Sequence, residues 1–398
     1  MTSTMPTPST RSDDDRTASL RRTLEGVIGV PATEGNRVDV LRNGVEIFPA
    51  MLEAIAQAQH TIDFLTFVYW SGEIGTTFAQ ALAARAREGV RVRVLLDGWG
   101  AHPIDRPLIE LMEGAGVMVH WFRQLRRFEP SKMNHRTHRK VMITDESVGF
   151  TGGVGIADEW NGDARNEREW RDTHFRVIGP AVDGLRAAFL DNWAETDPAL
   201  FDDSVDRFPT HPQPGESVIQ CVRGASESGW SDITTLYLTL LQKAEQRLRI
   251  ATAYFVPDQQ LIDQLCGAAN RGVDVEILLP GPHADKRFVQ VAAESAYEEL
   301  MDCGIRIWNF QPSMLHAKMM TVDGLVANIG SANFNARSTE LDEEINLVVL
   351  DEELVTILDR QFEEDLERSE AIAPGRWADR PVGQRVLERL TKPLRHEI

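Results

Sequence analysis

The stretch that decides the fold is residues 43–99, which read NGVEIFPAMLEAIAQAQHTIDFLTFVYWSGEIGTTFAQALAARAREGVRVRVLLDGW. Its pattern recurs in residues 223–281, which read RGASESGWSDITTLYLTLLQKAEQRLRIATAYFVPDQQLIDQLCGAANRGVDVEILLPG. In both, a helix-period segment leads to an apolar β-rich run, a second amphipathic helix, a Gly-Val turn and a buried strand. The expected helices are Met51–Ala58 and Thr76–Glu88, matched by Leu236–Ala244 and Gln260–Arg271; the expected strands are Thr61–Tyr69 and Arg91–Leu96, matched by Leu248–Val256 and Asp274–Leu279.

The parallel between the two copies continues downstream. Residues 116–119 and 304–307 each predict a short strand after a helix. Strands that alternate with helices are typical of βαβ units and of parallel sheets. We therefore expect an α/β protein made of two similar halves related by a pseudo-two-fold axis, each half a mostly parallel mixed sheet flanked by helices.

Composition sets the expected limits of these halves. Residues 1–22 are rich in Ser, Thr, Pro and Asp and have no apolar core, which predicts a disordered tail rather than a secretory signal. The proline-containing residues 202–215 predict a linker. The N-terminal half then covers 23–201 and the C-terminal half 216–373. Residues 374–398 form a basic tail that either packs on its own domain or lies on anionic lipid.

Charge and cysteine content narrow the function classes. The 398 residues carry a formal net charge of −19, which argues against a protein that coats nucleic acid. Cys221, Cys266 and Cys303 form no CxxC pair, so we expect free thiols in a reducing cytoplasm, with no metal site and no cofactor. No apolar run approaches the ~18–20 residues that span a bilayer, so a lipid substrate would be met from one side of the membrane.

Two short motifs carry the chemistry. The first is HRKVMITD at residues 138–145, followed by Gly-Gly at 152–153; the second is HAKMMTVD at 316–323, followed by GSAN at 330–333. Side chains two apart in a strand point to the same face, so each motif presents one imidazole and one ammonium together. A single His-x-Lys is usually surface decoration. Two copies at matching places in a repeat predict one shared site with two imidazoles and two ammonium groups.

That set of groups suits a phosphodiester. The two lysines balance the charge on the non-bridging oxygens of the transition state. One imidazole attacks phosphorus and forms a covalent phospho-histidine. The other, on the opposite side, protonates the leaving alkoxide and later deprotonates the incoming nucleophile. This mechanism requires no metal ion.

The paired motifs resemble those of the phospholipase D superfamily, and the wider sequence from Val38 to Leu394 resembles bacterial cardiolipin synthases. The resemblance implies that the catalytic motif residues are His138, Lys140 and Asp145 with His316, Lys318 and Asp323. It also implies phosphate contacts from Lys140, Lys318, Ser331 and Asn333, and a carboxylate partner for each imidazole, Glu344 for His316 and Asp172 for His138. We expect His138 to be the nucleophile, and the motif aspartates to pin a loop rather than act as acids.

The first motif departs from the superfamily pattern, because Gly153 and Gly155 stand where Ser and Asn are usual. The missing Asn removes one side-chain donor from the phosphate pocket, for which a backbone N–H or a water can substitute.

Three functions compete on this sequence. The first is phosphatidyl transfer between phospholipids, in which an anionic lipid such as phosphatidylglycerol serves as substrate, as the resemblance implies. The second is hydrolysis by the same chemistry, either as a phospholipase D or as a nuclease, and the third is a non-catalytic binding protein. Intact motifs disfavour the third, and the negative charge disfavours a nucleic-acid substrate. We expect a cytoplasmic protein, in peripheral contact with the inner face of the cell membrane; the sequence gives no oligomeric state.

Overall fold

The computed structural model describes residues 12–124, 134–200, 208–224 and 231–373. The basic tail 374–398, and with it the question of its contact with lipid, lies outside the described residues. The N-terminal half contains β1 (Thr33–Arg42), α2 (Asn43–Gln57), β2 (Thr61–Thr66), α3 (Glu73–Arg87), β3 (Arg91–Asp97), α4 (Arg106–Glu113), β4 (Met118–Phe122), β5 (Val141–Thr144), β6 (Val148–Gly152), β7 (Thr173–Ile178) and α6 (Val182–Ala194).

The C-terminal half repeats this order with small additions. It contains β8 (Ser217–Gly224), α7 (Asp232–Lys243), β9 (Arg247–Thr252), β10 (Phe255–Val256), α8 (Gln259–Asn270), β11 (Asp274–Pro280), α9 (Arg287–Asp302), β12 (Arg306–Phe310), β13 (Lys318–Val322), β14 (Val326–Gly330), β15 (Phe334–Asn335), β16 (Glu344–Leu350), α10 (Glu352–Leu366) and β17 (Ser369–Ala371). The helices and strands expected from the repeat are therefore present in both copies.

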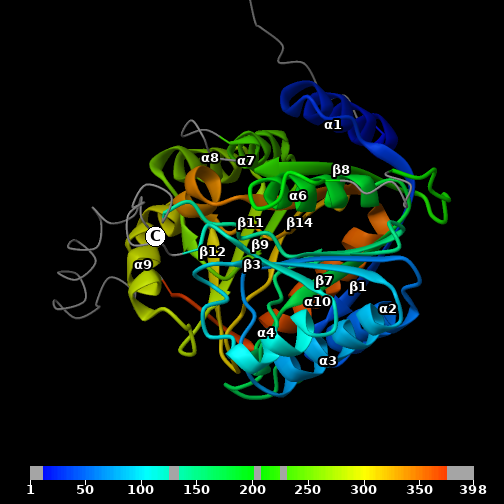
Figure 1. Ribbon diagram of the computed structural model, residues 1–398. Helices are drawn as coiled ribbons and strands as arrows, with labels where there is room; N and C mark the ends of the chain where they lie inside the picture. Colours follow the sequence, from blue (N-terminus) through cyan, green and yellow to red (C-terminus); the bar gives the residue numbers. More distant parts are fainter. Residues whose placement is uncertain (1–11, 125–133, 201–207, 225–230, 374–398) are drawn as a thin grey trace, which may run out of the picture.

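The sheet makes the internal symmetry visible. Fifteen strands form one sheet in the order β17-β12-β11-β9-β13-β14-β16-β8-β1-β7-β6-β5-β2-β3-β4. Read outward from the centre, β1-β7-β6-β5-β2-β3-β4 corresponds to β8-β16-β14-β13-β9-β11-β12. The two halves join where β1 pairs with β8 in antiparallel orientation. The strands thus run through the whole molecule, with α2, α3 and α4 along one side and α7 and α8 along the other (Figure 1).

The expectation of two similar α/β halves is confirmed, but parallel pairing is less extensive than expected. In the main sheet it is confined to β2-β3-β4 and β9-β11-β12. The strands that carry the motifs, β5 and β13, pair antiparallel on both sides. The motif strand and its successor form a hairpin, which reverses the chain without a crossover helix.

Local sequence explains where the helices begin and end. Ser231, Asp258 and Asp351 each accept a hydrogen bond from a backbone N–H in the first turn of α7, α8 and α10, as N-cap side chains do. After α3 and α8 the chain reverses at Gly89 and Gly272, whose φ angles of 91° and 94° lie in the left-handed region that favours glycine. These turns aim the chain into β3 and β11.

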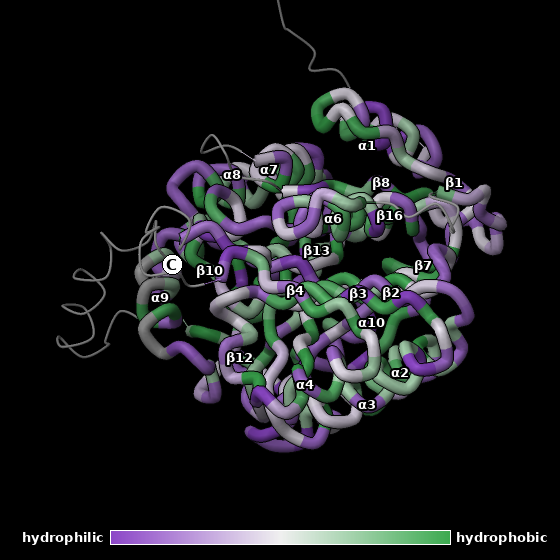
Figure 2. The backbone as a smooth tube through the Cα atoms, viewed as in Figure 1, coloured by the Kyte–Doolittle hydropathy of each residue, from purple (hydrophilic) through white to green (hydrophobic). Residues whose placement is uncertain are grey.

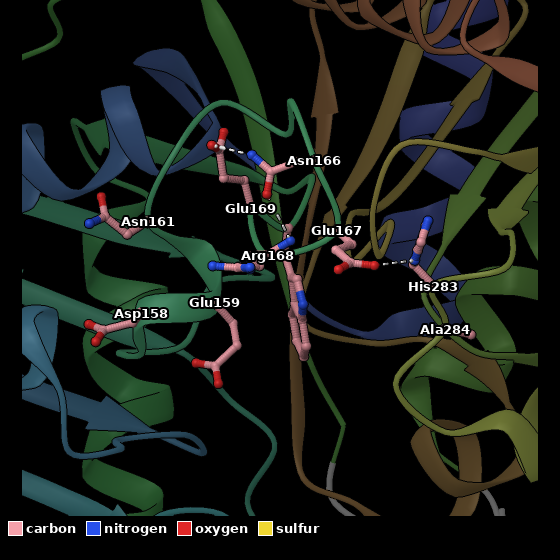
Figure 3. A pocket seen from close by; sticks show the side chains of 10 residues that line it. Asp158, Glu159, Asn161, Asn166, Glu167, Arg168, Glu169, His283 and Ala284 are labelled. Atoms are coloured by element: carbon pink, nitrogen blue, oxygen red, sulfur yellow. Dashed lines mark hydrogen bonds and ion pairs between the residues drawn. The ribbon is translucent and has the colours of Figure 1, made fainter.

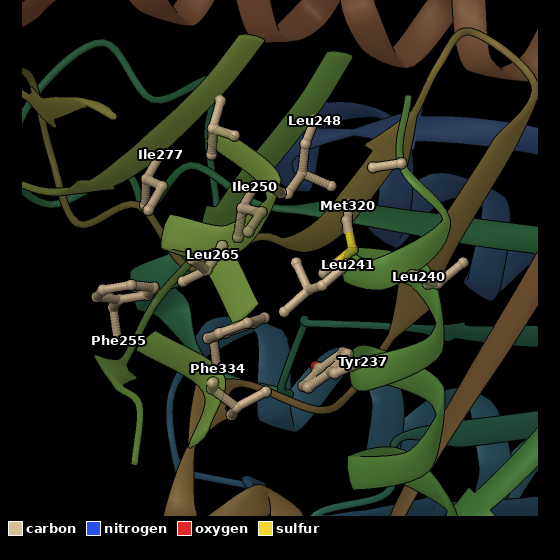
Figure 4. Close-up of a cluster of buried hydrophobic side chains, with 14 of the residues drawn as sticks. Tyr237, Leu240, Leu241, Leu248, Ile250, Phe255, Leu265, Ile277, Met320 and Phe334 are labelled. Atoms are coloured by element: carbon tan, nitrogen blue, oxygen red, sulfur yellow. The ribbon is translucent and has the colours of Figure 1, made fainter. Parts of the chain in front are cut away.

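Apolar side chains fill three clusters. One lies under α7, α8 and α9 in the C-terminal half and includes Tyr237, Leu241, Ile250 and Phe334 (Figure 4). Its counterpart lies under α2 and α3, and a central cluster joins the two halves through α6 and α10. The hydropathy of the chain follows this arrangement, with apolar residues along the inner strands and polar ones in outer loops (Figure 2).

One expectation about the ends of the halves changes. Residues 13–22, expected to belong to a disordered tail, lie in helix α1 (Asp13–Ile28), whose Leu24 and Ile28 pack into the C-terminal core. Ser12 caps this helix, and Arg16 pairs with Asp323. The helix forms because apolar residues late in the segment bury one face, although its first turns are polar. Of the expected linker, residues 208–215 contain no helix or strand and the rest lies outside the described residues.

Candidate active site

The segments that carry the two motifs contact the opposite half of the chain, away from the β1–β8 junction of the sheet. His138 and Lys140 directly precede β5, while Lys318 opens β13 and His316 stands two residues before it. The backbone N–H of His138 donates to the carbonyl of Glu343 (2.9 Å), and that of His316 donates to the carbonyl of Arg171 (2.7 Å). Each motif is thus held against the other half of the chain, next to that half's buried carboxylate.

The carboxylate partners are crossed relative to the expectation. His138 Nδ1 lies 2.9 Å from Glu344 Oε1, and His316 Nδ1 lies 2.9 Å from Asp172 Oδ2. The sequence had suggested Glu344 for His316 and Asp172 for His138, which is wrong. Each carboxylate follows its own motif along the chain, but the backbone contacts between the halves bring it to the imidazole of the other motif.

Glu344 is held as an anion. Ser331 and Ser338 donate hydroxyl hydrogen bonds to its two oxygens at 2.5 and 2.6 Å. Burial opposes its ionisation, but His138, Lys140 and Ser331 outweigh this and lower the pKa of Glu344 to about 2. Ser331, expected to contact phosphate, therefore donates to Glu344 in this structure. Ser338 lies in a short helical turn outside both motifs, so no sequence pattern pointed to it.

Asp172 is equally enclosed. It accepts hydrogen bonds from the indole N–H of Trp160 (2.8 Å) and the backbone N–H of Thr173 (2.8 Å) as well as from His316. Burial favours the neutral acid, yet the hydrogen bond and charge of His316 and the charge of Lys318 lower the pKa of Asp172. A fixed carboxylate at Nδ1 leaves Nε2 as the imidazole atom that can react.

Both imidazoles are neutral at pH 7. Burial lowers the pKa of His138 to about 3 and that of His316 to about 4, with the lysine charges adding to the effect and the carboxylates opposing it. The charge of Lys318 lowers the pKa of His138, and the charge of Lys140 lowers the pKa of His316. Each lysine therefore acts on the histidine of the other motif, as expected of one shared site. The neutral form of a nucleophilic imidazole carries the lone pair needed for attack.

The two lysines differ in their contacts. Lys140 Nζ donates to the carbonyl of His138 (2.7 Å) and lies over the Phe67 ring. Lys318 Nζ donates to the carbonyl of His316 (2.6 Å) and also lies 3.0 Å from its Nδ1. Burial lowers the pKa of Lys140 to about 7 and that of Lys318 to about 8, while the nearby carboxylates resist this. Bound phosphate would favour the charged form of both.

Aromatic rings wall the site. The Phe67 ring lies 5.1 Å from the His138 ring, and Trp160, Trp170 and Tyr254 surround His316 with centroids at 5.1, 5.5 and 6.3 Å. These rings add to the burial of the two imidazoles, and burial is the largest cause of their lowered pKa values.

A cavity of about 1220 Å³ opens beside this wall (Figure 3). Trp170 lines it, so it borders the His316 side of the site. Most of its lining residues are polar or charged and they come from both halves: Asp158, Glu159, Asn161 and 166–170 from one, His283 and Ala284 from the other. Glu167 and His283 face each other across it at 3.6 Å. The cavity has the size and polarity to admit a hydrated head group.

The motif aspartates lie at the far end of the motif strands. Asp145 accepts hydrogen bonds from the backbone N–H groups of Gln59, His60 and Thr61, just before β2. Asp323 accepts from those of residues 245–247, just before β9. The four residues of β5 separate Lys140 from Asp145, which makes five steps and roughly 17 Å at the usual rise of a strand. Both aspartates therefore hold a turn and lie away from the imidazoles.

The two glycines that follow the first motif, Gly153 and Gly155, lie so close to neighbouring atoms that a side chain would collide with them. A Cβ at Gly153 would lie 2.3 Å from Asp172 Oδ1, and a Cβ at Gly155 would lie 2.6 Å from Val68 Cβ. The side chains usual in the superfamily have no room at these positions. On the other half, Asn333 is buried and its Oδ1 has no hydrogen-bond partner among the described residues. An amide oxygen accepts hydrogen bonds and does not donate to phosphate, so the phosphate contact expected of Asn333 stays a prediction.

Comparison with known proteins identifies the family. The family model described as "Cardiolipin synthase, PLD-like domain" matches residues 51–168 and 237–366, which contain both motifs. The chain belongs to this family. It is 34% identical to cardiolipin synthase 1 of Bacillus cereus, covering 96% of this chain and 77% of that one, and 33% identical to the cardiolipin synthase of Geobacillus kaustophilus, covering 92% and 73%.

Solved structures agree on the phospholipase D-like fold. The phosphatidylserine synthase of Haemophilus influenzae superimposes with a TM-score of 0.75 over 96% of this chain and all of that one, at 15% identity. The polyphosphate kinase of Porphyromonas gingivalis gives 0.56 over 91% of this chain and 54% of that one, at 13% identity. At these identities the likeness concerns the fold alone.

Three further observations bear on the chemistry expected from the sequence. No helix within the described ranges is long and apolar enough to cross a bilayer. In the same part of the chain, no three His, Cys, Asp or Glu side chains gather as a metal site. Cys266 and Cys303 are joined by a disulfide, whereas free thiols had been expected, and only Cys221 is free. The expectation of a reducing cytoplasm therefore loses the support that it drew from the cysteines.

Proposed function

We propose that this chain transfers a phosphatidyl group from one phospholipid to the alcohol of another, through a covalent adduct on His138. The observation that carries the proposal is the pair of buried imidazoles, each bonded to a carboxylate of the opposite half and each with a buried lysine two residues further along the chain. The family membership supports a lipid substrate, and an anionic head group such as that of phosphatidylglycerol suits the lysines.

The first step forms the adduct. The neutral Nε2 of His138 attacks phosphorus while its Nδ1–H donates to Glu344. The bond from phosphorus to the leaving head-group oxygen breaks, and that oxygen takes the Nε2 proton of His316. The charge of the bound phosphodiester, together with Asp172, raises the pKa of His316 enough for it to hold this proton. Lys140 and Lys318 balance the charge on the non-bridging oxygens.

The second step releases the product. A second alcohol gives its proton to the now neutral Nε2 of His316, and its oxygen attacks phosphorus. The phosphorus–nitrogen bond breaks and His138 regains its lone pair. With phosphatidylglycerol as donor and acceptor the products are cardiolipin and glycerol. With water as acceptor the product is phosphatidic acid, which is the alternative function that the same site supports.

The test is product analysis. The purified protein is incubated with phosphatidylglycerol vesicles, with phosphatidylethanolamine vesicles and with both, and the lipids are identified by mass spectrometry. Cardiolipin supports transfer, phosphatidic acid supports hydrolysis, and neither product with any vesicle contradicts both. His138→Ala and His316→Ala are the controls for contaminating activity. Plasmid DNA in the same buffer tests for nuclease activity, which we expect to be absent.

The same assay tests the metal-free mechanism. The lysines provide the positive field at the phosphate, so we expect full activity in EDTA. Activity that disappears with EDTA and returns with a divalent ion would contradict this part of the proposal.

A further inference from the structure

A third histidine lies in the same row of the sheet as Lys140. Strand β6 places Thr151 opposite Val141, so extending the register by one residue puts Gly152 opposite Lys140. On its other side Gly152 pairs with His174 of β7. Residues directly opposite each other in antiparallel strands point to the same face. Because the residue between them is a glycine, the row holds no side chain between Lys140 and His174, and the charge of Lys140 acts on His174.

The imidazole of His174 fills the space above the glycine. A Cβ added at Gly152 would lie 2.6 Å from His174 Nδ1. The His174 side chain is buried, and its Nδ1 has no hydrogen-bond partner among the described residues. A buried, unpaired polar atom is costly and calls for a functional explanation. Here the unpaired atom lies in the row that contains a lysine of the proposed active site.

The other half shows what this position looks like without a histidine. There Lys318 and Gly330 take the places of Lys140 and Gly152, and Asn346 takes the place of His174. Asn346 is satisfied, since it donates to Asn328 Oδ1 (2.9 Å) and accepts from the N–H of Ala332 (3.2 Å). Lys318 contacts the ring of its own histidine instead. The two halves therefore differ at this one position of the row.

Resting on the proposed function, we propose that His174 is a positioning residue whose neutral imidazole accepts a hydrogen bond at Nδ1 from the Lys140 ammonium when that lysine grips the phosphate. An ammonium has three donors. Lys140 already gives one to the carbonyl of His138, so one would go to His174 and one to a phosphate oxygen. His174 would then compensate in the first half for the donor side chain that Gly155 lacks, by fixing the lysine that remains.

The charges around the pair are consistent with this arrangement. Burial and the charge of Lys140 lower the pKa of His174 to about 4, while Asp172 raises it, so the ring is a neutral acceptor at pH 7. The ionisable groups that act on Lys140 are Glu344, Asp172 and Asp342, which favour its charge, and Lys318, which opposes it. His174 adds a neutral acceptor to these charged groups, beside the carbonyl of His138 that already accepts from Lys140.

Inorganic phosphate is the first probe, measured by isothermal titration calorimetry on the full chain. His174→Asn keeps an acceptor where Nδ1 stands, His174→Leu keeps the volume without an acceptor, and His174→Gln moves the acceptor to the place of Nε2. We expect phosphate affinity near wild type for His174→Asn and a loss of about 10-fold for His174→Leu and His174→Gln. Equal affinity in all four proteins would overturn the inference, even if His174→Leu alone proved unstable, because His174→Gln is polar.

The pH profile of kcat/KM is the second readout. A hydrogen-bond acceptor stabilises the charged lysine, so its removal lowers the pKa of Lys140. The alkaline limb should therefore move to lower pH in His174→Leu and stay in place in His174→Asn. His120→Leu, in β4 and stacked on Trp193, is the matched control and should change neither readout. An unmoved limb in His174→Leu would contradict the positioning role.

The two proposals fail in different ways. A wild-type protein that binds phosphate but converts no lipid would contradict the proposed function, while the calorimetric comparison would still test His174. An active wild type with equally active His174→Leu and His174→Gln would remove the role of His174 and leave the proposed function in place.

Discussion

His138 and Glu344 lie 206 residues apart in the chain, yet Nδ1 of the imidazole and Oε1 of the carboxylate are 2.9 Å apart. The equivalent contact of His316 with Asp172 runs the other way between the halves. Neither half therefore holds a complete histidine–carboxylate pair of its own. A site of this kind exists only when both halves are folded and joined.

The crossed pairs predict which variants lose which step. With a p-nitrophenyl phosphodiester, whose leaving group needs no protonation, the first step requires His138 with Glu344 and the two lysines but no general acid. We expect Asp172→Asn to keep a burst of p-nitrophenol and to slow the steady state by about 10²–10⁴-fold. Glu344→Gln should lose the burst. The reverse result would make His316 the nucleophile, and mass spectrometry of the trapped adduct would locate it independently.

Buried neutral histidines predict a pH dependence of stability. His138, His174 and His316 have folded pKa values of about 3, 4 and 4 against 6.5 when unfolded. The unfolded chain thus binds more protons between pH 6.5 and about 4, and stability falls as pH falls through that window, by up to ~1.4 kcal/mol per pH unit for each group. Asp342, whose burial raises its pKa to about 7, acts in the opposite direction.

One variant isolates a single histidine from this sum. The free energy of unfolding in urea should fall less steeply between pH 6.5 and 4 for His174→Asn than for wild type, by about one proton. Parallel curves for the two proteins would mean that His174 is not buried in the neutral form.

The close contacts of Gly153 predict that replacing it by serine, the usual residue of the superfamily, lowers both stability and activity. In Gly153→Ser the new Cβ would lie 2.3 Å from Asp172 Oδ1 and 2.7 Å from the carbonyl of His316, so the carboxylate must move. We expect a destabilisation of about 1–3 kcal/mol together with reduced kcat. Gly26→Ala in α1 is the control, since nothing lies within 4 Å of its Cβ, and it should be neutral or stabilising. Wild-type activity in Gly153→Ser would refute the close contact.

The position of the motif aspartates predicts that replacing one of them lowers the free energy of unfolding but leaves kcat unchanged. Asp145 accepts three backbone N–H groups, so Asp145→Ala should lower the free energy of unfolding by about 1–3 kcal/mol. The kcat measured well below the melting temperature should stay close to wild type, because the carboxylate does not contact the imidazoles. A folded Asp145→Ala protein as inactive as His138→Ala would show instead that the aspartate takes part in the reaction.

Much of the fold and the composition of the site follow from the sequence. Strand and helix periodicity, repeated in residues 43–99 and 223–281, specify two similar halves, and alternation along a strand puts His138 beside Lys140 and His316 beside Lys318. The helical start at residues 13–22 was missed because the core contact lies later in the helix, at Leu24 and Ile28. Local composition alone does not reveal such a contact.

The partnership of each imidazole was decided by the tertiary structure. A carboxylate downstream of a histidine can reach either motif, and nothing local distinguishes the two. The backbone contacts between Thr137 and Glu343, and between Arg171 and Leu315, bring the edge of each half to the motif of the other. They send Glu344 to His138 and Asp172 to His316. Such long-range backbone pairing leaves no pattern in the local sequence. For this reason the two histidines and the two carboxylates could be predicted from the sequence, but which carboxylate bonds to which histidine could not.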